Sequence, residues 1–373
     1  MPSSSPRSPD VLVLGGGIIG LSAAWRAARR GLTATVVDPD PGRGATHAAA
    51  GMLAPVSEVT YTEEPLLRLG LASLALWPAF AAELSADSGH NLDYRTDGTL
   101  DVAFGADDMA ALDDLSVFLD KLGLPFDRLT GRECRRMEPM LAPSVRGGLL
   151  ARGDAWVDPR RAAAALLAAL DRHGVPVLRR RAAEVLPGEG VRLSGGDVLT
   201  ASRTVIACGA WSGSLPGLPP GVAPPVRPVK GQIMRLRDPS RLLTHTVRGT
   251  VHGSSVYLVP RGDGEVVLGA TQEEMGFDTR VTAGGLWELL RDARELVPGV
   301  TELEVADTVA GLRPGTPDNL PLIGPTAVPG LHMATGHHRG GVLLAPLTAD
   351  LLFGDGDKGL ALACSPRRFK EDA

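Results

Sequence analysis

Near its beginning the chain reads Val11-Leu12-Val13-Leu14-Gly15-Gly16-Gly17-Ile18-Ile19-Gly20, and an alanine-rich segment then runs to Gly31. A second apolar run, residues 34–37, ends at Asp38. A short apolar run, a G-x-G-x-x-G turn, a helix-forming segment and a second apolar run are typical of a dinucleotide-binding β-α-β unit. The pattern therefore predicts such a unit over residues 11–38.

The glycines of this pattern have separate physical roles. Gly15 allows the tight turn from strand to helix, Gly17 lets a pyrophosphate approach the backbone, and Gly20 lets the helix pack closely on the strand. The phosphates then lie at the helix N-terminus, where free N–H groups and the helix dipole favour an anion. Asp38 can accept hydrogen bonds from ribose hydroxyls, which indicates an adenine dinucleotide with a free 2′-OH and argues against NADP.

The composition bounds the class of protein. The chain has 373 residues, a formal net charge of −5, 44% hydrophobic residues and 22% charged residues. These values are ordinary for a globular protein, and the length suggests two domains. There is no basic block, so nothing favours nucleic acid as a partner. The three cysteines lack the spacing of a disulfide framework or a metal site, which fits a reducing cytoplasm.

Neither a signal peptide nor a membrane-spanning helix is expected. Residues 1–9 lack the apolar core of a signal peptide. The apolar run of residues 69–82 is short, and Pro78 interrupts it. We therefore expect a cytoplasmic protein without a membrane partner, and the sequence leaves open whether it forms a homo-oligomer.

The rest of the sequence alternates between helix-forming segments and short strand-forming runs. Helices are expected over residues 63–87, 106–122, 159–173, 285–296 and 342–353. Short alternating runs predict strands at 98–104, 231–236, 256–259 and 266–270, and the proline-rich segment 216–228 predicts a crossing between domains. The fold class is thus α/β, with a discontinuous nucleotide-binding domain and an α+β substrate domain whose sheet is mainly antiparallel. The nucleotide-binding domain is expected over residues 1–90, 145–222 and 305–373, and the substrate domain over residues 91–144 and 223–304.

Short motifs spaced over the whole chain carry a resemblance. The motifs are Ala48-Ala49-Ala50-Gly51-Met52-Leu53, Gly209-Ala210-Trp211-Ser212, Pro228-Val229-Lys230-Gly231-Gln232, Tyr257-Leu258-Val259-Pro260, Leu268-Gly269-Ala270-Thr271, Gly311-Leu312-Arg313-Pro314-Gly315-Thr316 and Gly336-His337-His338-Arg339-Gly340-Gly341. Together with the first motif, they make residues 10–355 similar to FAD-dependent amine oxidases of the D-amino acid oxidase superfamily. The chain most resembles the glycine oxidases of thiamine biosynthesis.

This resemblance implies that FAD is the cofactor, held in a Rossmann-like domain of the glutathione-reductase type. The absence of cysteine between residues 209 and 363 implies that the flavin is not covalently attached. The N-terminus of the helix expected after Gly341 would face the flavin and stabilise the negative charge of its reduced form. The implied cofactor-binding residues are Gly15, Gly17, Ile18, Ile19, Gly20, Asp38, Pro39, Thr46, His47, Ala50, Gly51, Met52, Val185, His337, His338, Arg339, Gly340, Gly341, Val342 and Leu343.

The substrate would be held by its carboxylate. Arg313, in the rigid sequence Gly-Leu-Arg-Pro-Gly, is suited to a bidentate grip on a carboxylate. Tyr257 would present its hydroxyl to the same group, and Arg339 would be a second positive charge. Alternative explanations are an interdomain ion pair for Arg313, a core position for Tyr257 and a role for Arg339 toward the cofactor alone. The pair His337-His338 is not favoured as a general base, because adjacent side chains in a loop point in different directions.

The resemblance implies oxidation of glycine, sarcosine or D-alanine by hydride transfer to flavin, without a protein nucleophile or a metal. Dioxygen then reoxidises the flavin and gives hydrogen peroxide, and the imine of glycine supplies thiamine thiazole synthesis. Ser255 and Gln272 differ from the expected pocket residues and leave the exact amine open. One alternative is a D-amino acid or imino acid dehydrogenase that uses a non-oxygen acceptor. Another is a non-catalytic flavin-binding assembly module.

Overall fold

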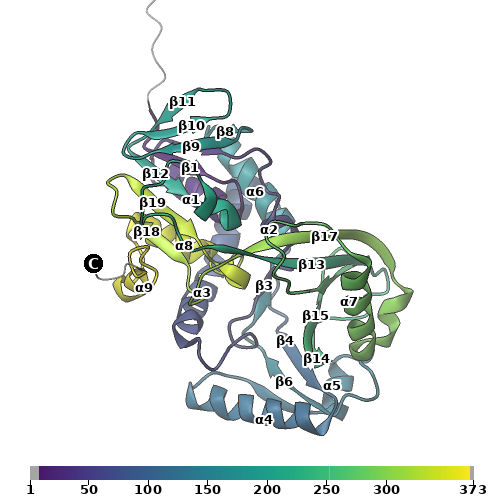
Figure 1. Ribbon diagram of the computed structural model, residues 1–373. Coiled ribbons are helices and arrows are strands. Elements are labelled where there is room, and N and C mark those ends of the chain that lie inside the picture. The colour runs from purple at the N-terminus through teal and green to yellow at the C-terminus, as the bar shows by residue number, and fades with distance from the viewer. Residues whose placement is uncertain (1–7, 252, 370–373) are drawn as a thin grey trace, which may run out of the picture.

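Two large β-sheets, of six and eight strands, organise the chain (Figure 1). The computed structural model of the protein describes residues 8–251 and 253–369. The six-stranded sheet has the order β18-β19-β12-β1-β2-β8. Its strands are β1 Val11–Leu14, β2 Ala34–Val37, β8 Val177–Leu178, β12 Arg203–Ile206, β18 Leu322–Pro325 and β19 Leu331–Thr335.

Parallel pairing explains the continuous apolar runs of this sheet. Strand β1 pairs in parallel with β2 and β12, and all four of its residues are buried. Helices cover the sheet, so its central strands have no polar face. The helices that form the associated core are α1 Ile18–Arg29, α3 Glu64–Ser88, α6 Pro159–Arg172 and α8 Ala345–Phe353.

The eight-stranded sheet has the order β17-β13-β16-β15-β14-β4-β6-β5 and is antiparallel except where β14 pairs with β4. The chain enters this sheet twice, first through β4 to β6 and later through β13 to β17. Helix α7, Ala283–Leu296, packs on it with an apolar face that includes Leu289 and Leu296 (Figure 1). The strands are β4 Thr99–Ala103, β5 Asp127–Thr130, β6 Gly147–Ala151, β13 Arg227–Arg237, β14 Thr246–Val251, β15 Ser254–Pro260, β16 Glu265–Gly269 and β17 Glu304–Gly315.

Smaller elements complete the described chain. They are a three-stranded sheet of β9 Ala182–Leu186, β10 Gly190–Leu193 and β11 Val198–Thr200, the pair β3 Met52–Leu53 and β7 Ala155–Trp156, the helices α2 Ala45–Ala48, α4 Ala106–Lys121, α5 Gly131–Met137 and α9 Lys358–Ala363, and the 3₁₀ helices η1 Gly209–Ser214, η2 Pro298–Glu302 and η3 His338–Gly340.

The α/β class, the β-α-β start and the mainly antiparallel second sheet are confirmed. The proline-rich segment leads from η1 into β13 and so connects the two sheets. The predicted domain ranges remain a proposal. Two strands nevertheless fall on the other side of the proposed division, because β6 and most of β17 pair in the eight-stranded sheet. The N-terminal residues 1–7 lie outside the described residues.

The last long helix begins later than predicted. The sequence pattern places its start at Val342, but α8 begins at Ala345, and η3 with a turn occupies the residues before it. Pro346 lies in the first turn of α8, where its missing N–H would lack an intrahelical partner in any case. The helix N-terminus is therefore displaced along the chain from Gly340 and Gly341.

The helix expected over residues 63–87 is confirmed as α3, which runs through Pro78 without a break, so this proline does not shorten the apolar run in the way expected. Pro78 removes one backbone donor but leaves the rest of the helix intact. By length and composition α3 is long and apolar enough to cross a membrane. Core helices pass the same test, and α3 buries Leu69, Trp77 and Phe80 against the protein core.

Candidate active site

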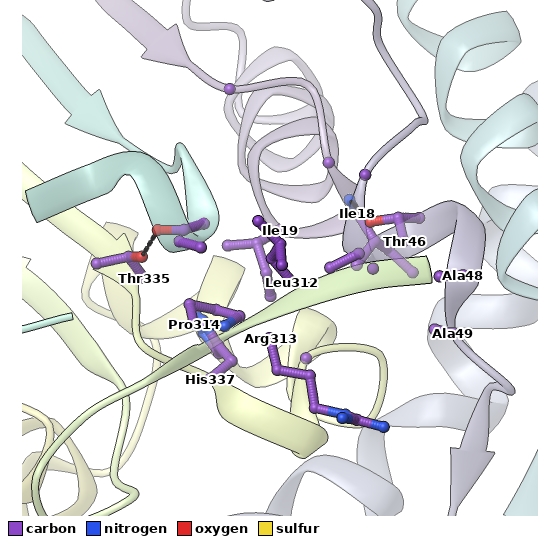
Figure 2. A pocket seen from close by; sticks show the side chains of 18 of the residues that line it. Ile18, Ile19, Thr46, Ala48, Ala49, Leu312, Arg313, Pro314, Thr335 and His337 are labelled. Carbon is purple, nitrogen blue, oxygen red and sulfur yellow. Dashed lines mark hydrogen bonds between the residues drawn. The ribbon is translucent and has the colours of Figure 1, made fainter. Parts of the chain in front are cut away.

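A cavity of about 870 Å³ is lined by residues of both large sheets. We name its two ends by their residues. The dinucleotide end is formed by Gly15, Gly17, Asp38 and Thr46, and the substrate end by Glu58, Arg248, Tyr257, Arg313 and Arg339. In Figure 2, Ile18 and Thr46 lie next to each other, and the side chain of Arg313 extends away from them. The cavity therefore brings the first motif together with residues far along the chain.

Close approach of the backbone shapes the dinucleotide end. Gly15 has φ +109°, and a Cβ there would lie 2.3 Å from the carbonyl oxygen of Ala207. A Cβ on Gly20 would lie 1.9 Å from the carbonyl oxygen of Gly15. Gly20 therefore permits the close packing of α1, as the sequence indicated, and it does not line the cavity. Gly17 is the N-cap of α1 and does line it.

The carboxylate of Asp38 is positioned by the backbone around it. Its Oδ2 accepts from the N–H of Gly16 at 2.7 Å, and its Oδ1 accepts from the N–H of Asp40 at 2.7 Å. Each carboxylate oxygen has a further lone pair, so the group can also accept from ribose hydroxyls. Asp38 and Pro39 both line the cavity, in agreement with their predicted position.

Hydrogen bonds that involve buried groups fix the segment around α2. Thr46 Oγ1 accepts from the N–H of Ile18 at 3.0 Å, which ties α2 to the first turn of α1. Arg261 is fully buried, donates to the carbonyl oxygen of Ala50, and lies over the ring of Trp156 at 5.0 Å. These contacts position the cavity-lining residues Ala50, Gly51 and Met52.

Arg313 is the central cation of the substrate end. Its Nη1 donates to the carbonyl oxygens of Lys230 at 3.4 Å and Thr271 at 3.2 Å. The guanidinium lies across the backbone of β13, where a Cβ on Gly231 would be 2.4 Å from Nη1. Gly231 therefore makes the room that Arg313 occupies.

Tyr257 lies beside this guanidinium. Burial raises the pKa of the Tyr257 hydroxyl to about 12, while Arg313 lowers it and also forms a hydrogen bond with it. The hydroxyl thus stays protonated at neutral pH and can donate to an anion. A Cβ on Gly269 would lie 2.5 Å from this hydroxyl oxygen, so a second strand glycine clears its space.

Arg339 lines the cavity but already has an acidic partner. Its Nη2 donates to Glu63 at 2.9 Å, to Thr60 Oγ1 at 3.0 Å and to the carbonyl oxygen of Glu58 at 3.1 Å. The structure therefore gives Arg339 a role in holding residues 58–63, which the sequence did not indicate.

The two adjacent histidines face different surroundings, as expected. His337 is buried, its Nε2 is 2.9 Å from Thr348 Oγ1, and burial lowers its pKa to about 3. His338 has φ +47°. Burial lowers its pKa to about 4, with Arg313 and Arg339 adding to the effect. Both imidazoles are therefore neutral at neutral pH.

Most of the predicted cofactor residues line the cavity. Those that the structure does not place in its lining are Gly20, His47, Val185, Gly340 and Leu343. Burial lowers the pKa of His47 to about 4, and its ring lies 2.9 Å from Arg43 Nη1. Val185 is buried and donates its N–H to the carbonyl oxygen of Pro216 at 2.8 Å. The predicted contact of these five residues with FAD stays a prediction.

Sequence reasoning missed several lining residues, above all Glu58 and Arg248. Glu58 follows the Ala48–Leu53 motif, and Arg248 pairs in register with Tyr257 across β14 and β15. The register pairing would have revealed Arg248, but no local sequence pattern gives it. Within residues 8–251 and 253–369, no group of three or more His, Cys, Asp or Glu side chains is placed to hold a metal ion.

The cavity fits the FAD that the resemblance implies. Its volume lies within the range of small-molecule and cofactor sites, about 300–1,000 Å³. One end offers the N-terminus of α1, a glycine where a Cβ would strike backbone, and a carboxylate with free lone pairs. Such a set suits a pyrophosphate and a ribose, and it leaves the substrate end for the flavin and a small molecule.

Known proteins are similar to this chain in both sequence and fold. Residues 10–353 match the family described as "DAO: FAD dependent oxidoreductase". The chain is 35% identical to a glycine oxidase of Geobacillus kaustophilus over 92% of this chain and 91% of that protein. It is also 33% identical to the bifunctional protein ThiO/ThiG of Trichormus variabilis, over 92% of this chain and 52% of that protein. The chain thus spans about half the length of this bifunctional relative.

Other similarities extend this picture. A hydrogen cyanide synthase subunit of Pseudomonas aeruginosa is 31% identical over 93% of this chain and 92% of that protein. The crystal structure of the glycine oxidase from Geobacillus kaustophilus superposes with a TM-score of 0.88 and 34% identity, covering 97% of this chain and 99% of that one. An iminodiacetate oxidase from Chelativorans gives a TM-score of 0.82 at 27% identity, covering 96% and 97% of the two chains.

Proposed function

This chain belongs to the DAO family of FAD-dependent oxidoreductases, and from that premise we propose that it oxidises glycine and related small amines such as sarcosine and D-alanine. It is an FAD-dependent amine oxidase, and the alternative of a non-catalytic flavin-binding module is not consistent with this family. The observation that carries the proposed substrate is the pair Arg313 and Tyr257 at the end of the cavity opposite the dinucleotide motif.

The proposed roles follow from the chemistry of these side chains. When bound, FAD supplies a two-electron acceptor that dioxygen reoxidises with release of hydrogen peroxide. Arg313 binds the substrate carboxylate through its planar guanidinium, and Tyr257 donates its hydroxyl to the same group. Held at two points, the carboxylate fixes the orientation of the Cα that loses its hydride. The cofactor-binding role belongs to the dinucleotide end, to residues 48–52 and to residues 337–343.

We further propose that the imine of glycine is the product used in thiamine thiazole synthesis. This rests on relatives named for thiamine biosynthesis, among them a putative thiamine biosynthesis oxidoreductase ThiO of Rhizobium etli, 35% identical over 91% of this chain. The three cysteines of the chain are unpaired, which supports the expectation of a reducing cytoplasm.

A direct experiment tests the function. Purified protein should be yellow and release FAD on denaturation, and glycine should bleach the flavin in the absence of oxygen. With oxygen present, the products should be glyoxylate and hydrogen peroxide in equal amounts. Coloured protein that no small amine bleaches would contradict the proposed reaction.

A second candidate shares the reductive step and differs only in the electron acceptor. This second candidate is supported by the similarity of nearly the whole chain to a hydrogen cyanide synthase subunit. In that case glycine reduces the flavin anaerobically, but an artificial dye reoxidises it and oxygen yields little peroxide. Measuring both half-reactions with the same preparation separates the two candidates.

A further inference from the structure

The backbone of residues 56–58 is held on several sides at the substrate end. Two of its N–H groups donate to the buried carboxylate of Asp154, and two of its carbonyl oxygens accept from arginines. The segment is therefore fixed independently of any ligand. The contacts are Val56 N to Asp154 Oδ1 at 3.3 Å, Ser57 N to Asp154 Oδ2 at 3.2 Å, Arg248 Nη1 to the Ser57 carbonyl oxygen at 2.7 Å and Arg339 Nη2 to the Glu58 carbonyl oxygen at 3.1 Å.

The side chain of Glu58 contrasts with this fixed backbone. It lines the cavity and is half-buried. Among the described residues, no hydrogen bond or ion pair engages its carboxylate. A carboxylate that is partly withdrawn from water loses some of its hydration, and a partner of opposite charge compensates this loss. A fixed backbone with an unengaged carboxylate is what a ligand-binding group requires.

The other charges at the substrate end are already neutralised, apart from one. Arg248 Nε lies 3.4 Å from Asp101, and Arg339 Nη2 lies 2.9 Å from Glu63. Arg313 has only carbonyl and hydroxyl partners within the described parts of the chain. One cation and one anion, Arg313 and Glu58, thus remain without a partner of opposite charge.

The two unpaired charges line the same cavity as the Tyr257 hydroxyl. Burial is the main cause of the raised pKa of Tyr257, and the next contributions come from Arg313, which lowers it, and Glu58, which raises it. Both charges therefore act on Tyr257 from within the same cavity. In the described parts of the chain no ion pair joins them, so each can bind a ligand group of opposite charge in the cavity.

We propose that Glu58 binds the protonated amine of the substrate while Arg313 and Tyr257 bind its carboxylate. This inference rests on the proposed function and specifies the substrate class as small zwitterions. A carboxylic acid without an amine binds only Arg313 and Tyr257, so the negative charge of Glu58 stays uncompensated in the cavity and repels the ligand. The cavity thereby selects α-amino acids and N-alkyl glycines over carboxylates of the same size.

The test compares ligands that differ only in the amine. Glycine affinity is measured as the half-saturation of anaerobic flavin bleaching, and glycolate affinity as the change in the flavin absorption spectrum of the same holoenzyme. In Glu58→Gln, glycine should bind about tenfold to a hundredfold more weakly, which is the value of a charge-assisted contact. Glycolate should bind more tightly than to the wild type, because its repulsion by Glu58 is gone.

The opposite directions of the two shifts separate binding from a structural role. A variant that merely loosens residues 56–58 weakens glycine and glycolate together, and that result would overturn the proposal. Glu64→Gln is the matched control, because Glu64 carries the same charge in the neighbouring helix and pairs on the surface with Arg68 at 2.8 Å. It should leave both affinities unchanged.

Three further outcomes are informative. If the wild type neither binds nor oxidises glycine, the proposed function fails, whereas unchanged glycine affinity in Glu58→Gln refutes only the role of Glu58. If Glu58→Gln does not retain flavin, the proposal is tested by comparing the affinities of the wild-type protein for glycine and glycolate. Glycine should then bind at least about tenfold more tightly than glycolate, and equal affinities would refute the amine contact.

Discussion

The dinucleotide end and the substrate end of the cavity are built in different ways. The first is made by backbone within one short stretch, where Gly15 and Gly17 open the surface and Asp38 is held by two N–H groups. The second is made by long side chains that four separate segments contribute, namely residues 56–58, β14 with β15, β17 and the segment at 337–339.

The difference shows how the two halves of the site tolerate change. At Gly15 an added side chain would meet backbone, so a substitution there allows no intermediate fit. A side-chain-built end can lose one contact and keep the rest, so its variants should shift affinity by degrees. Predictions that separate cofactor retention from substrate affinity therefore test the comparison directly.

The largest effect is expected at the backbone-built end. Gly15→Ala adds a Cβ that would lie 2.3 Å from the carbonyl oxygen of Ala207, at a φ of +109°. We expect protein that is colourless or does not fold, as measured by flavin absorbance and by thermal unfolding. Gly31→Ala is the control, because Gly31 has φ +76° but no atom within 4 Å of its Cβ position. Gly15→Ala with full flavin content would contradict the backbone argument.

The next effect is expected at Arg313. Arg313→Ala removes the unpaired guanidinium, and the KM for glycine should rise about a hundredfold, corresponding to about 3 kcal/mol. Flavin content and absorbance should stay as in the wild type, because the dinucleotide end is untouched. Arg313→Lys should recover part of the affinity. An unchanged KM would remove Arg313 from the carboxylate site.

A smaller change should follow from a variant that displaces Arg313 without removing it. Gly231→Ala places a Cβ 2.4 Å from Nη1 of Arg313, so the guanidinium must move while its charge remains. We expect the KM for glycine to rise about tenfold. Gly284→Ala in α7, where a Cβ meets nothing within 4 Å, should leave the KM unchanged. Equal KM values in the two variants would show that the pose of Arg313 is not set by Gly231.

The smallest effect concerns pH. Burial raises the pKa of Asp154 from 3.8 to about 6, despite hydrogen bonds from Ser57 and Val56 that lower it. The folded protein thus holds a proton that the unfolded chain has released. The resulting stabilisation is complete below pH 3.8 and is lost as the pH rises through about 6.

Asp154→Asn isolates this titration, because asparagine keeps the size of the side chain and does not titrate. The wild type should lose about 1 kcal/mol of unfolding free energy relative to Asp154→Asn between pH of about 5 and about 7.5. Denaturant unfolding of both proteins at the two pH values measures it. If the difference in unfolding free energy between the two proteins is the same at both pH values, Asp154 does not titrate in this pH range.

The two ends also differ in how well the sequence predicted them. The β-α-β unit was found because its signal is local, with glycine spacing, apolar runs and a terminal acid in one stretch. Arg313 and Tyr257 were found through motifs of a resembling family. Glu58 and Arg248 were missed because their positions depend on strand register and on the anchoring of residues 56–58, and neither is encoded by neighbours in sequence.

The start of α8 was predicted wrongly, and the effect of Pro78 on the apolar run of α3 was misjudged, for a related reason. Apolar periodicity indicates that a helix exists, but it does not show whether a proline falls where its missing donor matters. Pro78 lies inside α3 and is tolerated, whereas Pro346 lies in the first turn of α8 and accompanies a start at Ala345. Packing in the folded protein decides between these two outcomes.

Ser255 and Gln272 are exposed and also line the cavity. Within the described chain, neither side chain has a hydrogen bond to the rest of the protein. An engineer who wishes to broaden or narrow the range of accepted amines can therefore randomise these two codons together. Such a library would sample new specificities while the scaffold and the coenzyme stay in place.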